Sequence, residues 1–396
     1  MKILMTTTSF PLYKDHTAGI FIYEQAKSFL SLGQEVTILA PFASGSKKNE
    51  IIDDIKIKRF DYFFPQKHQG LCYGAGVPAN LKKGLKYKIQ LPLLVFFFFV
   101  HCLLLGRKHD VIYAHWTLSG LSAVIVGKIL RKPVVVMIHH GQENFNKLKF
   151  LHKIPIEKAD HVVFNSSFTM GKTLISFKPK AYSVIPPGVD INKFKPIDVS
   201  GYSKYFQSYG INKDSKVIFA MGRHIDWKGY DYLLKAFADI EDKYVLLVLA
   251  GSGPETANLK NLAKNLKIEK RVIFAGSIQN DKTPLFYNRS LLFVQPSIID
   301  EHGNTEGLGV VILEALACGT PVAASSVGGI IDIIINGENG FLFEQKNSQQ
   351  IKNIIEKSIK REFKDNNLPA KARDFVLNKY SWDILTEKNL NLLLKL

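Results

Sequence analysis

Cysteine is scarce in this chain of 396 residues. The three cysteines, Cys72, Cys102 and Cys318, are an odd number and do not have the spacing of metal ligands. This usage argues against a framework of several disulfides and against a zinc site built from cysteine pairs. We therefore expect no disulfide, and we expect a reducing compartment for the protein.

Long apolar runs are also rare. The most apolar stretch, Leu91 to Leu105, has fifteen residues and contains Pro92 and His101, whereas a membrane-spanning helix needs about 20 residues. A spanning helix is therefore not expected. The first ten residues, MKILMTTTSF, are too short and too polar after Met5 to supply the apolar centre of a secretion signal. They predict a first buried strand instead.

Acidic residues are few relative to basic ones, with 35 Asp and Glu against 52 Lys and Arg, which gives a formal net charge of +17. Such a charge attracts nucleic acid, an anionic membrane face or acidic substrates, and does not choose among them. No module of basic and aromatic residues for stacking on bases is apparent, so nucleic acid is not an expected partner. The length and the hydrophobic content of 46% predict a globular protein of two domains.

Short runs rich in β-branched residues alternate with longer helical patterns, which is typical of α/β folds with parallel sheets. The first set of predicted strands is KILMT, EVTILAP, DVIYAH, PVVVMIH, HVVFN and YSVIP. The second set is KVIFAMG, YVLLVLAG, RVIFAGS, LLFVQPS, TPVAASS and GFLFE. We predict two doubly wound domains with a ligand-binding cleft at the carboxyl ends of their strands.

The domain boundary is predicted between Pro186 and Gly210, where Pro, Gly and polar residues interrupt any periodic pattern. An N-terminal domain would cover residues 1–195 and a C-terminal domain residues 205–379. The last residues, 380–396, have the pattern of an amphipathic helix. We expect this helix to pack back on the first domain.

The segment MGRHIDWKGY, from Met221 to Tyr230, connects an apolar strand to the start of a helix. Arg223 and Lys228 are therefore expected in a loop at the carboxyl edge of the sheet. Two cations there can bind a diphosphate, Arg through paired hydrogen bonds and Lys as a point charge. The alternative is that both are solvated loop cations, which are common in a chain with this many basic residues.

A second segment, EGLGVVILE, places Glu306 and Glu314 eight positions apart. If it were wholly helical, about 12 Å along the axis would separate the carboxylates, too far to act on one atom. With a helix beginning near Leu308, Gly307 and Gly309 permit close backbone approach, and free amide N–H groups point toward an anion. A diphosphate bound there would lie between two carboxylates able to accept hydrogen bonds from a sugar and a ribose. The alternative is a capping Glu followed by a solvated one.

The segment EGLGVVILEALACGTPVAASSVGGIIDIIINGENGFLF closely resembles the Glu-x7-Glu region of the retaining glycosyltransferases of family 4, which have the GT-B fold of two Rossmann-like domains. MGRHIDWKGYDYLLKAF resembles the donor-phosphate loop of the same family. VLAGSGPE, VIFAGSI, VIPPGVDINKF and the closing YSWDIL also match in order. The resemblance covers nearly the whole chain.

The resemblance implies roles for individual residues. Arg223 and Lys228 would bind the donor diphosphate, Glu306 the transferred sugar, and Glu314 the ribose of the nucleotide. The donor would also contact the turn before the helix, at Gly307, Leu308 and Gly309. The family needs no metal, because the two cations and the helix amides neutralise the leaving nucleoside diphosphate. In agreement, no Asp-x-Asp pair stands at a strand end to hold Mg²⁺.

In the N-terminal half, SFPLYKDHTAGIFIYEQAKSFLSLGQEVTILAP resembles the family's first loop and helix, where a glycine pair approaches the donor or acceptor. This chain has Ala18 and Gly19 there. Because Ala does not adopt positive φ cheaply, only Gly19 is assigned to donor binding.

The family's acceptor-side histidine falls within VVVMIHHGQENF. His140 is assigned this catalytic role because it precedes Gly141, as in the family's His-Gly-x-Asp pattern, with Glu143 in place of Asp. His139 competes for the role, and a lone His after a strand is more often structural. Catalytic roles are thus assigned to His140, Glu306, Arg223 and Lys228.

A further family loop resembles AHWTLSG and makes His115 an acceptor-side candidate together with His139. Packing of His115 against Trp116 is an equal alternative.

Basic residues bracket the most apolar stretch of the chain. Lys82, Lys83, Lys86 and Lys88 precede it, and Arg107 and Lys108 follow it. Each cation near an anionic leaflet contributes on the order of 1 kcal/mol, so this face is hypothesised to dock peripherally on the inner face of the cytoplasmic membrane. The alternative is a buried helix with solvated flanks, and for the Phe-rich run itself the buried helix is preferred.

The resemblance implies a cytoplasmic, metal-independent, retaining transferase without a cofactor. It would move a hexosyl group from a UDP- or GDP-linked sugar to a hydroxyl of a glycan or lipid-linked acceptor, in the assembly of a surface polysaccharide. Two alternatives keep the same fold. One is an epimerase that isomerises the sugar nucleotide without an acceptor, and the other is a non-catalytic subunit that binds a nucleotide sugar.

Overall fold

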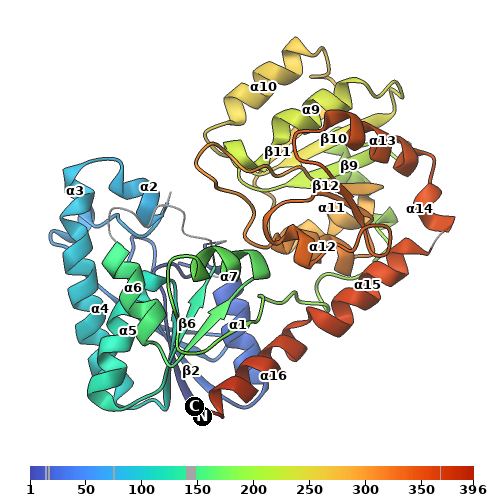
Figure 1. Ribbon diagram of the computed structural model, residues 1–396. Helices are drawn as coiled ribbons and strands as arrows, with labels where there is room; N and C mark the ends of the chain where they lie inside the picture. Colours follow the sequence, from blue (N-terminus) through green and yellow to red (C-terminus); the bar gives the residue numbers. More distant parts are fainter. Residues whose placement is uncertain (14–15, 17, 75, 140–148, 366) are drawn as a thin grey trace. The chain divides into compact units, whose positions relative to one another are not determined.

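The computed structural model describes residues 1–13, 16, 18–74, 76–139, 149–365 and 367–396. The chain divides into two compact units, each built around its own sheet (Figure 1). The first unit is Met1–Pro187 together with Trp382–Leu396, and the second is Gly188–Ser381. The prediction of two α/β domains with parallel sheets is confirmed.

Within the described residues, the first unit has an eight-stranded sheet with the order β3-β4-β2-β1-β5-β6-β7-β8. Neighbouring strands are parallel except β3 and β4, which are antiparallel. Its strands are β1 (Lys2–Thr6), β2 (Glu35–Pro41), β3 (Asn49–Ile52), β4 (Ile55–Phe60), β5 (Val111–His115), β6 (Val134–Ile138), β7 (His161–Phe164) and β8 (Tyr182–Val184). Strands β1, β5 and β6 are almost entirely buried, as expected where helices cover both faces of a parallel sheet.

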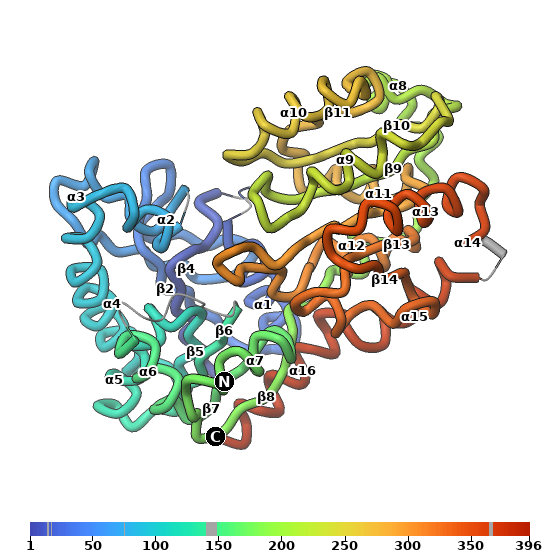
Figure 2. The backbone as a smooth tube through the Cα atoms, turned by 45° about the horizontal axis from the view of Figure 1, so that its top comes forward, coloured from blue at the N-terminus to red at the C-terminus, as the bar shows by residue number. Residues whose placement is uncertain are grey.

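The helices of the first unit are α1 (Ile20–Ser31), α2 (Val77–Leu81), α3 (Leu85–Lys88), α4 (Gln90–Gly106), α5 (Thr117–Leu130), α6 (Lys149–Lys158), α7 (Ser167–Leu174) and α16 (Trp382–Leu393). The C-terminal helix α16 packs on α1 in this unit, and Figure 2 lets the two be followed side by side. The Tyr113 hydroxyl donates a hydrogen bond of 2.8 Å to Asn389, and the Thr386 hydroxyl donates one of 2.7 Å to Ser28.

The hairpin of β3 and β4 was not predicted from the sequence. In β4 the side chains alternate between buried and exposed positions, and Lys56 and Lys58 occupy exposed ones. Asp53 and Asp54 form the turn with positive φ angles of 45° and 62°, a conformation that Asp tolerates better than most residues. The signal was the strict alternation IKIK at residues 55–58, which is typical of a half-buried strand.

In the second unit, the described residues form a six-stranded sheet, parallel throughout, with the order β11-β10-β9-β12-β13-β14. The strands are β9 (Lys216–Met221), β10 (Val245–Ala250), β11 (Val272–Gly276), β12 (Leu292–Gln295), β13 (Val322–Ser325) and β14 (Phe341–Phe343). The strand order reverses between β9 and β12, and in doubly wound sheets ligands bind at the carboxyl ends of the strands beside this reversal.

The helices of the second unit are α8 (Ser203–Gln207), α9 (Tyr230–Ala238), α10 (Thr256–Asn265), α11 (Thr283–Arg289), α12 (Val310–Ala317), α13 (Ser348–Ile359), α14 (Glu362–Asp365) and α15 (Leu368–Lys379). They flank the sheet, and one apolar cluster joins the inward sides of α9, α10 and α13 to β9 and β10. Residues such as Leu233, Phe237 and Leu247 in this cluster are fully buried.

The division between the units, at Pro187 and Gly188, falls at the start of the predicted boundary segment from Pro186 to Gly210. The sequence placed residues 188–195 in the first domain, but the structure places them in the second. The Asn288 side chain donates a hydrogen bond of 3.0 Å to the Lys195 carbonyl and accepts one of 2.9 Å from the Ile197 amide. The Phe194 ring also packs edge-on to Tyr287. These long-range contacts are not encoded in any local pattern, which is why composition alone did not assign residues 188–195 to the second unit.

The apolar stretch is longer than its sequence pattern suggested. Leu85–Gly106 forms a helical segment of 22 residues that is long and apolar enough to cross a membrane by length and composition, and 28% of its most apolar window is buried. The length argument against a spanning helix is therefore wrong. The preferred buried helix is also only partly correct, because buried positions recur as one stripe, at Gln90, Leu94, Phe98, Cys102 and Gly106.

Candidate active site

The loop after β9 holds the two predicted cations. Arg223 lies two residues after the strand and is exposed, whereas Lys228 ends a short 3₁₀ turn and is buried. Gly229 then begins α9 in the left-handed conformation, with φ 65°. A Cβ on Gly229 would lie 2.1 Å from the Pro296 carbonyl oxygen, so the loop can approach the end of β12 only with glycine there.

Lys228 and Glu306 form a buried ion pair at the carboxyl edge of the sheet. The Lys228 ammonium donates to the Glu306 carboxylate, and only about a tenth of each side chain is exposed, 10% and 11%. The Gln295 amide lies 3.4 Å from the same carboxylate oxygen and donates to Ser297 at 2.8 Å. The structure therefore joins the predicted phosphate loop to the first residue of the EGLGVVILE segment.

Several buried polar atoms around this pair have no hydrogen-bond partner within the part of the chain that is described. They are the Tyr230 hydroxyl, the Gln295 side-chain oxygen and the Thr305 hydroxyl. Burial, followed by the nearby Glu306 carboxylate, raises the pKa of Tyr230, so its hydroxyl keeps its proton and can donate. Because unpaired buried polar groups cost free energy, this edge of the sheet is suited to a polar ligand.

Glycines hold the Glu306 loop in place. A Cβ on Gly328 would lie 2.0 Å from the Glu306 carbonyl oxygen, and one on Gly329 would lie 2.1 Å from the Gly307 carbonyl oxygen. The Gly329 amide donates a hydrogen bond of 3.0 Å to the Glu306 carbonyl. Both glycines belong to the 3₁₀ helix η5 (Gly328–Asp332). Side chains at these positions would push the loop away from η5.

Helix α12 begins two residues later than predicted. Gly309 is its N-terminal capping residue, with φ 94°, and Leu308 is buried before it. Glu306 therefore precedes the helix, whereas Glu314 lies within it. The two carboxylates have different partners, because Glu306 pairs with Lys228 and Glu314 accepts a hydrogen bond of 2.7 Å from the Tyr287 hydroxyl. Burial raises the pKa of Glu314 to about 7, against the lowering effect of the Tyr287 hydrogen bond.

The Arg223 loop is supported from its other side by the turn after β10. Gly251 and Gly253 approach this loop so closely that a Cβ would lie 1.9 Å from the Gly222 carbonyl oxygen or 2.3 Å from the His224 carbonyl oxygen. The His224 amide donates to the Ser252 carbonyl at 3.1 Å. The GSGPE motif thus fixes the backbone of the loop that carries Arg223.

The first unit contains a second polar cluster at the carboxyl ends of β5 and β6. His115 ends β5 and His139 follows β6, and the His115 Nδ1 and His139 Nε2 atoms are 2.9 Å apart. The rings stack with centroids 5.2 Å apart, and Phe21 and Trp116 each lie 4.6 Å from the His139 ring. Burial lowers the pKa of His115 to about 3, so this histidine is neutral. The structure brings the two acceptor-side candidates together.

Trp116 has a φ of 73°, which is unusual for a residue with a bulky side chain. Such backbone strain is found most often at functional sites. His140 and Glu143 lie outside the described residues.

Gly19, assigned to donor binding, is the N-terminal capping residue of α1 with φ 70°. A Cβ there would lie 2.4 Å from the Ser9 carbonyl oxygen. Glycine is therefore required here because the backbone packs against the chain's own β1–α1 loop.

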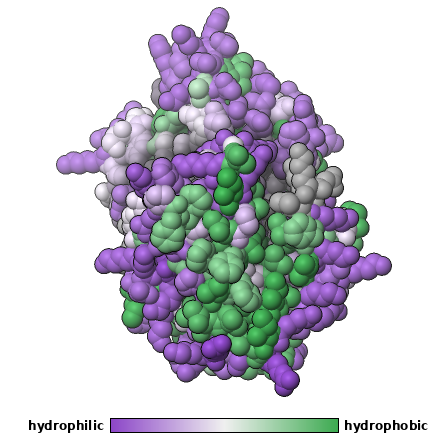
Figure 3. Space-filling model, turned by 90° about the vertical axis from the view of Figure 1, so that its left-hand side faces the viewer, coloured by the Kyte–Doolittle hydropathy of each residue, from purple (hydrophilic) through white to green (hydrophobic). Residues whose placement is uncertain are grey.

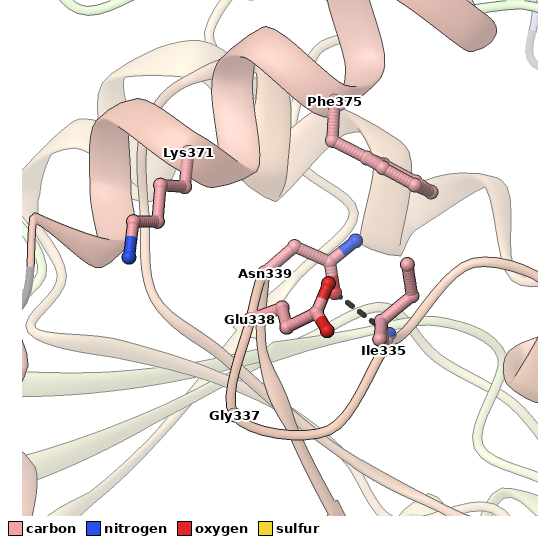
Figure 4. A pocket seen from close by; sticks show the side chains of 6 residues that line it. All are labelled: Ile335, Gly337, Glu338, Asn339, Lys371 and Phe375. Atoms are coloured by element: carbon pink, nitrogen blue, oxygen red, sulfur yellow. Dashed lines mark hydrogen bonds between the residues drawn. The ribbon is translucent and has the colours of Figure 1, made fainter.

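A shallow pocket of the second unit lies apart from these clusters. It is lined by Ile335, Gly337, Glu338, Asn339, Lys371 and Phe375, between the loop before β14 and α15 (Figure 4). None of the predicted site residues lines it. The Asn339 side chain accepts a hydrogen bond of 2.8 Å from the Ile335 amide and donates one of 2.9 Å to the Ile333 carbonyl, so its role is to shape the loop.

The sequence alone did not predict a role for Tyr230, Tyr287, Gln295 or the pair Gly328 and Gly329. Gln295 had a weak signal, because a polar residue ends an otherwise apolar strand, and the glycine pair closes the SSVGG segment. The tyrosines gave no signal, since each looks like an ordinary apolar position of a helix.

Two family models match this chain. The model of glycosyl transferases group 1 matches residues 202–375, and the model of glycosyltransferase family 4 matches residues 18–193. The fold and these matches define a glycosyltransferase with the GT-B fold. The chain belongs to the family 4-like glycosyltransferases.

Individual relatives support this assignment. The chain is 29% identical to an uncharacterized glycosyltransferase of Methanocaldococcus jannaschii over 72% of its length and 75% of that protein. It is 28% identical to the GDP-mannose-dependent alpha-(1-6)-phosphatidylinositol monomannoside mannosyltransferase of Mycolicibacterium smegmatis, over 69% of this chain and 74% of that one. Among solved structures, Anabaena HepE in complex with UDP has a TM-score of 0.78 at 22% identity, with 100% of both chains covered.

Proposed function

We propose that this glycosyltransferase transfers a hexosyl group from a UDP- or GDP-linked sugar to a hydroxyl of a glycan or lipid-linked acceptor, with retention of configuration. The observation that carries the proposal is the buried Lys228–Glu306 pair surrounded by unpaired polar atoms. A cation there can neutralise a leaving diphosphate, and buried polar groups nearby can bind sugar hydroxyls. Names of relatives give further support, since one is GDP-mannose-dependent and a structural neighbour was solved with UDP.

In this proposal, Arg223 and Lys228 bind the donor diphosphate, Glu306 contacts the transferred sugar, and Glu314 accepts hydrogen bonds from the ribose. Gly307, Leu308 and Gly309 form the backbone turn at the diphosphate. His139 and His115, with His140, serve the acceptor side. The reaction proceeds without a metal ion or cofactor, because the cations and backbone amides take the charge of the leaving group.

The setting that we propose is the cytoplasm, in the assembly of a surface polysaccharide. The lysines that precede α4 give the first unit a basic surface, and peripheral contact with an anionic membrane is part of the proposal. Such contact would bring the enzyme to a lipid-linked acceptor.

The test begins with thermal stabilisation by UDP, GDP and ADP, because a ligand that binds only the native state raises apparent stability. One nucleoside diphosphate should raise Tm, and EDTA should not change the effect. Arg223→Ala and Lys228→Ala should weaken binding at least about tenfold, as expected for lost charge-assisted hydrogen bonds. Lys243→Ala, at an exposed lysine of the same unit, is the matched control.

Removing Lys228 leaves Glu306 buried without its partner, which destabilises the fold independently of ligand. The double variant Lys228→Ala/Glu306→Gln restores electrical neutrality and separates the two effects. If the double variant regains both stability and nucleotide affinity, the assignment of Lys228 to diphosphate binding is wrong. Turnover with the stabilising nucleotide's sugar, followed by NMR of the product's anomeric proton, tests transfer and retention.

A further inference from the structure

The outward side of α3, α4 and α5 is an apolar surface that the proposed reaction does not use. We call it the α4–α5 face, and its exposed members are Leu85, Ile89, Leu93, Phe96, Leu104, Ile125 and Ile129. Helices α4 and α5 pack side by side, so these residues lie on neighbouring elements. Figure 3 shows a broad hydrophobic area on this side of the molecule, bordered by hydrophilic side chains.

Packing against the sheet explains only part of the apolar character of α4. Leu94, Phe98 and Cys102 are fully buried and form the stripe that faces the core of the first unit. On the outer side, Phe96 and Leu104 are each 56% exposed. A surface helix of a water-soluble domain carries polar residues on its outer side, so the exposed apolar residues of α4 point to a partner that covers them.

The charge around this surface is mostly positive. Between Tyr62 and Ile156 the acidic residues are Asp110 and Glu143 alone, whereas lysine and arginine stand at both ends of α4 and at the end of α5. Long basic side chains beside an apolar helix can extend their charged ends to lipid headgroups while their stems cover hydrocarbon. An anionic lipid surface complements both the apolar centre and the basic border.

The way α4 is held decides its orientation toward lipid. Its buried stripe packs on the first unit, and the Ser122 hydroxyl of α5 donates a hydrogen bond of 3.1 Å to the Val95 carbonyl. Crossing a bilayer would require pulling this stripe out of the core. A helix held in this way would meet a bilayer along its length and would not cross it.

We propose that the α4–α5 face inserts into the interfacial layer of an anionic bilayer and attaches the first unit by hydrophobic contact. This goes beyond the peripheral charge contact of the proposed function, and it holds whether or not that function is correct. Amphipathic surfaces of this kind bury their apolar side about 5–10 Å deep, at the boundary of headgroups and acyl chains. Attachment should therefore persist where salt screens charge.

The test is flotation of the full chain with phosphatidylcholine vesicles that contain anionic phosphatidylglycerol, at about 0.1 M and about 1 M NaCl. Wild type should float at both salt concentrations. The variant Leu93→Ser/Phe96→Ser/Leu104→Ser should bind at least about tenfold more weakly at both, because it removes three apolar side chains that would be buried in the lipid. Replacing Lys82, Lys83, Lys86 and Lys88 by Gln should weaken binding mainly at low salt.

Matched controls use exposed apolar residues outside this surface, with Ile175→Ser in the first unit and Tyr244→Ser in the second. Both should float like wild type. Circular dichroism and Tm verify that the triple variant is folded, as expected for changes at exposed positions. Phe96→Trp should show a blue-shifted emission with vesicles and quenching by brominated lipids, whereas Ile175→Trp should show neither.

Four outcomes would overturn the proposal. The first is that the triple variant floats as well as the wild type. The second is that about 1 M NaCl releases the wild type completely, which would leave charge as the only attachment. A third is that the wild type resists extraction with alkaline carbonate, which would show a spanning helix. The fourth is that the triple substitution changes the oligomeric mass in solution and leaves flotation unchanged, which would identify a second copy of the chain as the partner.

Discussion

At the residue scale, the Lys228–Glu306 pair shows how the proposed donor site opposes stability. Two charges are largely withdrawn from water, and desolvation of such a pair commonly offsets its Coulomb attraction. Unpaired polar atoms of Tyr230 and Gln295 add to the cost. A site arranged in this way is poised for a charged ligand, whose phosphate and hydroxyl groups can complete the missing hydrogen bonds.

Glu314 gives a pH dependence whose sign can be stated. Its pKa is about 7 in the fold against 4.5 for the ordinary side chain, so the native state holds this proton more tightly than the unfolded chain. Stability therefore falls as pH rises from about 4.5 to about 7, and the penalty is complete above pH 7. A pKa raised from 4.5 to about 7 corresponds to a penalty of about 3 kcal/mol.

Glu314→Gln removes the titrating group and keeps an oxygen that can accept from Tyr287. We expect the variant to gain stability relative to wild type between pH 5 and pH 8, measured by urea denaturation at each pH. Glu338→Gln, at an exposed position of the same unit, is the control. If the free energies of unfolding of Glu314→Gln and wild type differ by the same amount at pH 5 and pH 8, then the pKa of Glu314 is not raised by the fold.

At the element scale, the start of α12 is set by its surroundings as much as by its sequence. Gly309 begins the helix in a left-handed conformation, and η5 presses its two glycines against the loop before it. The loop therefore has little freedom to move away from Lys228. Close packing between the backbones of η5 and the Glu306 loop therefore helps to hold Glu306 in position.

Gly329→Ala tests this packing. Its new methyl group would meet the Gly307 carbonyl oxygen at 2.1 Å, so the Glu306 loop must shift. We expect a loss of about 2 kcal/mol or more in stability, typical of overpacking, and weaker nucleotide binding by calorimetry. Gly171→Ala is the control, because a Cβ at this helical position meets nothing within 4 Å. It should be neutral or stabilising by up to about 1 kcal/mol.

At the scale of the whole molecule, the last helix belongs to the first unit although the second unit lies between them in the sequence. Leu385, Thr386 and Asn389 of α16 are buried there. The Tyr113 hydroxyl at the sheet donates to Asn389. The first unit is therefore completed only after the second has been synthesised.

Removal of residues 382–396 should destabilise the first unit selectively. Hydrogen exchange measured by mass spectrometry should show lost protection in α1 and β5, with β9 and β12 unchanged. Asn389→Ala should cost about 1–2 kcal/mol because it leaves the buried Tyr113 hydroxyl without this acceptor, whereas exposed Lys388→Ala should cost little. Equal loss of protection in both units would contradict the assignment of α16 to the first.

The sequence by itself determined the class of fold and most of its strands. Twelve predicted strands, from KILMT to GFLFE, are present, because buried parallel strands need apolar, β-branched runs that stand out from their surroundings. The cations of the β9–α9 loop and the carboxylates around α12 were also visible, since charged residues beside glycines contrast with an apolar core. The hairpin of β3 and β4 was missed because its alternation with lysine is weaker than the signal of a buried strand.

Only the tertiary structure decided which of these residues meet. The pairing of Lys228 with Glu306, the contact of Glu314 with Tyr287 and the stacking of His115 on His139 join residues that are far apart in the sequence. It also showed that one side of α4 is buried and the other exposed, which an apolar composition on all sides conceals. A local sequence pattern indicates whether a residue is buried or exposed. Its contact partners depend on how strands and loops from distant segments of the chain pack together.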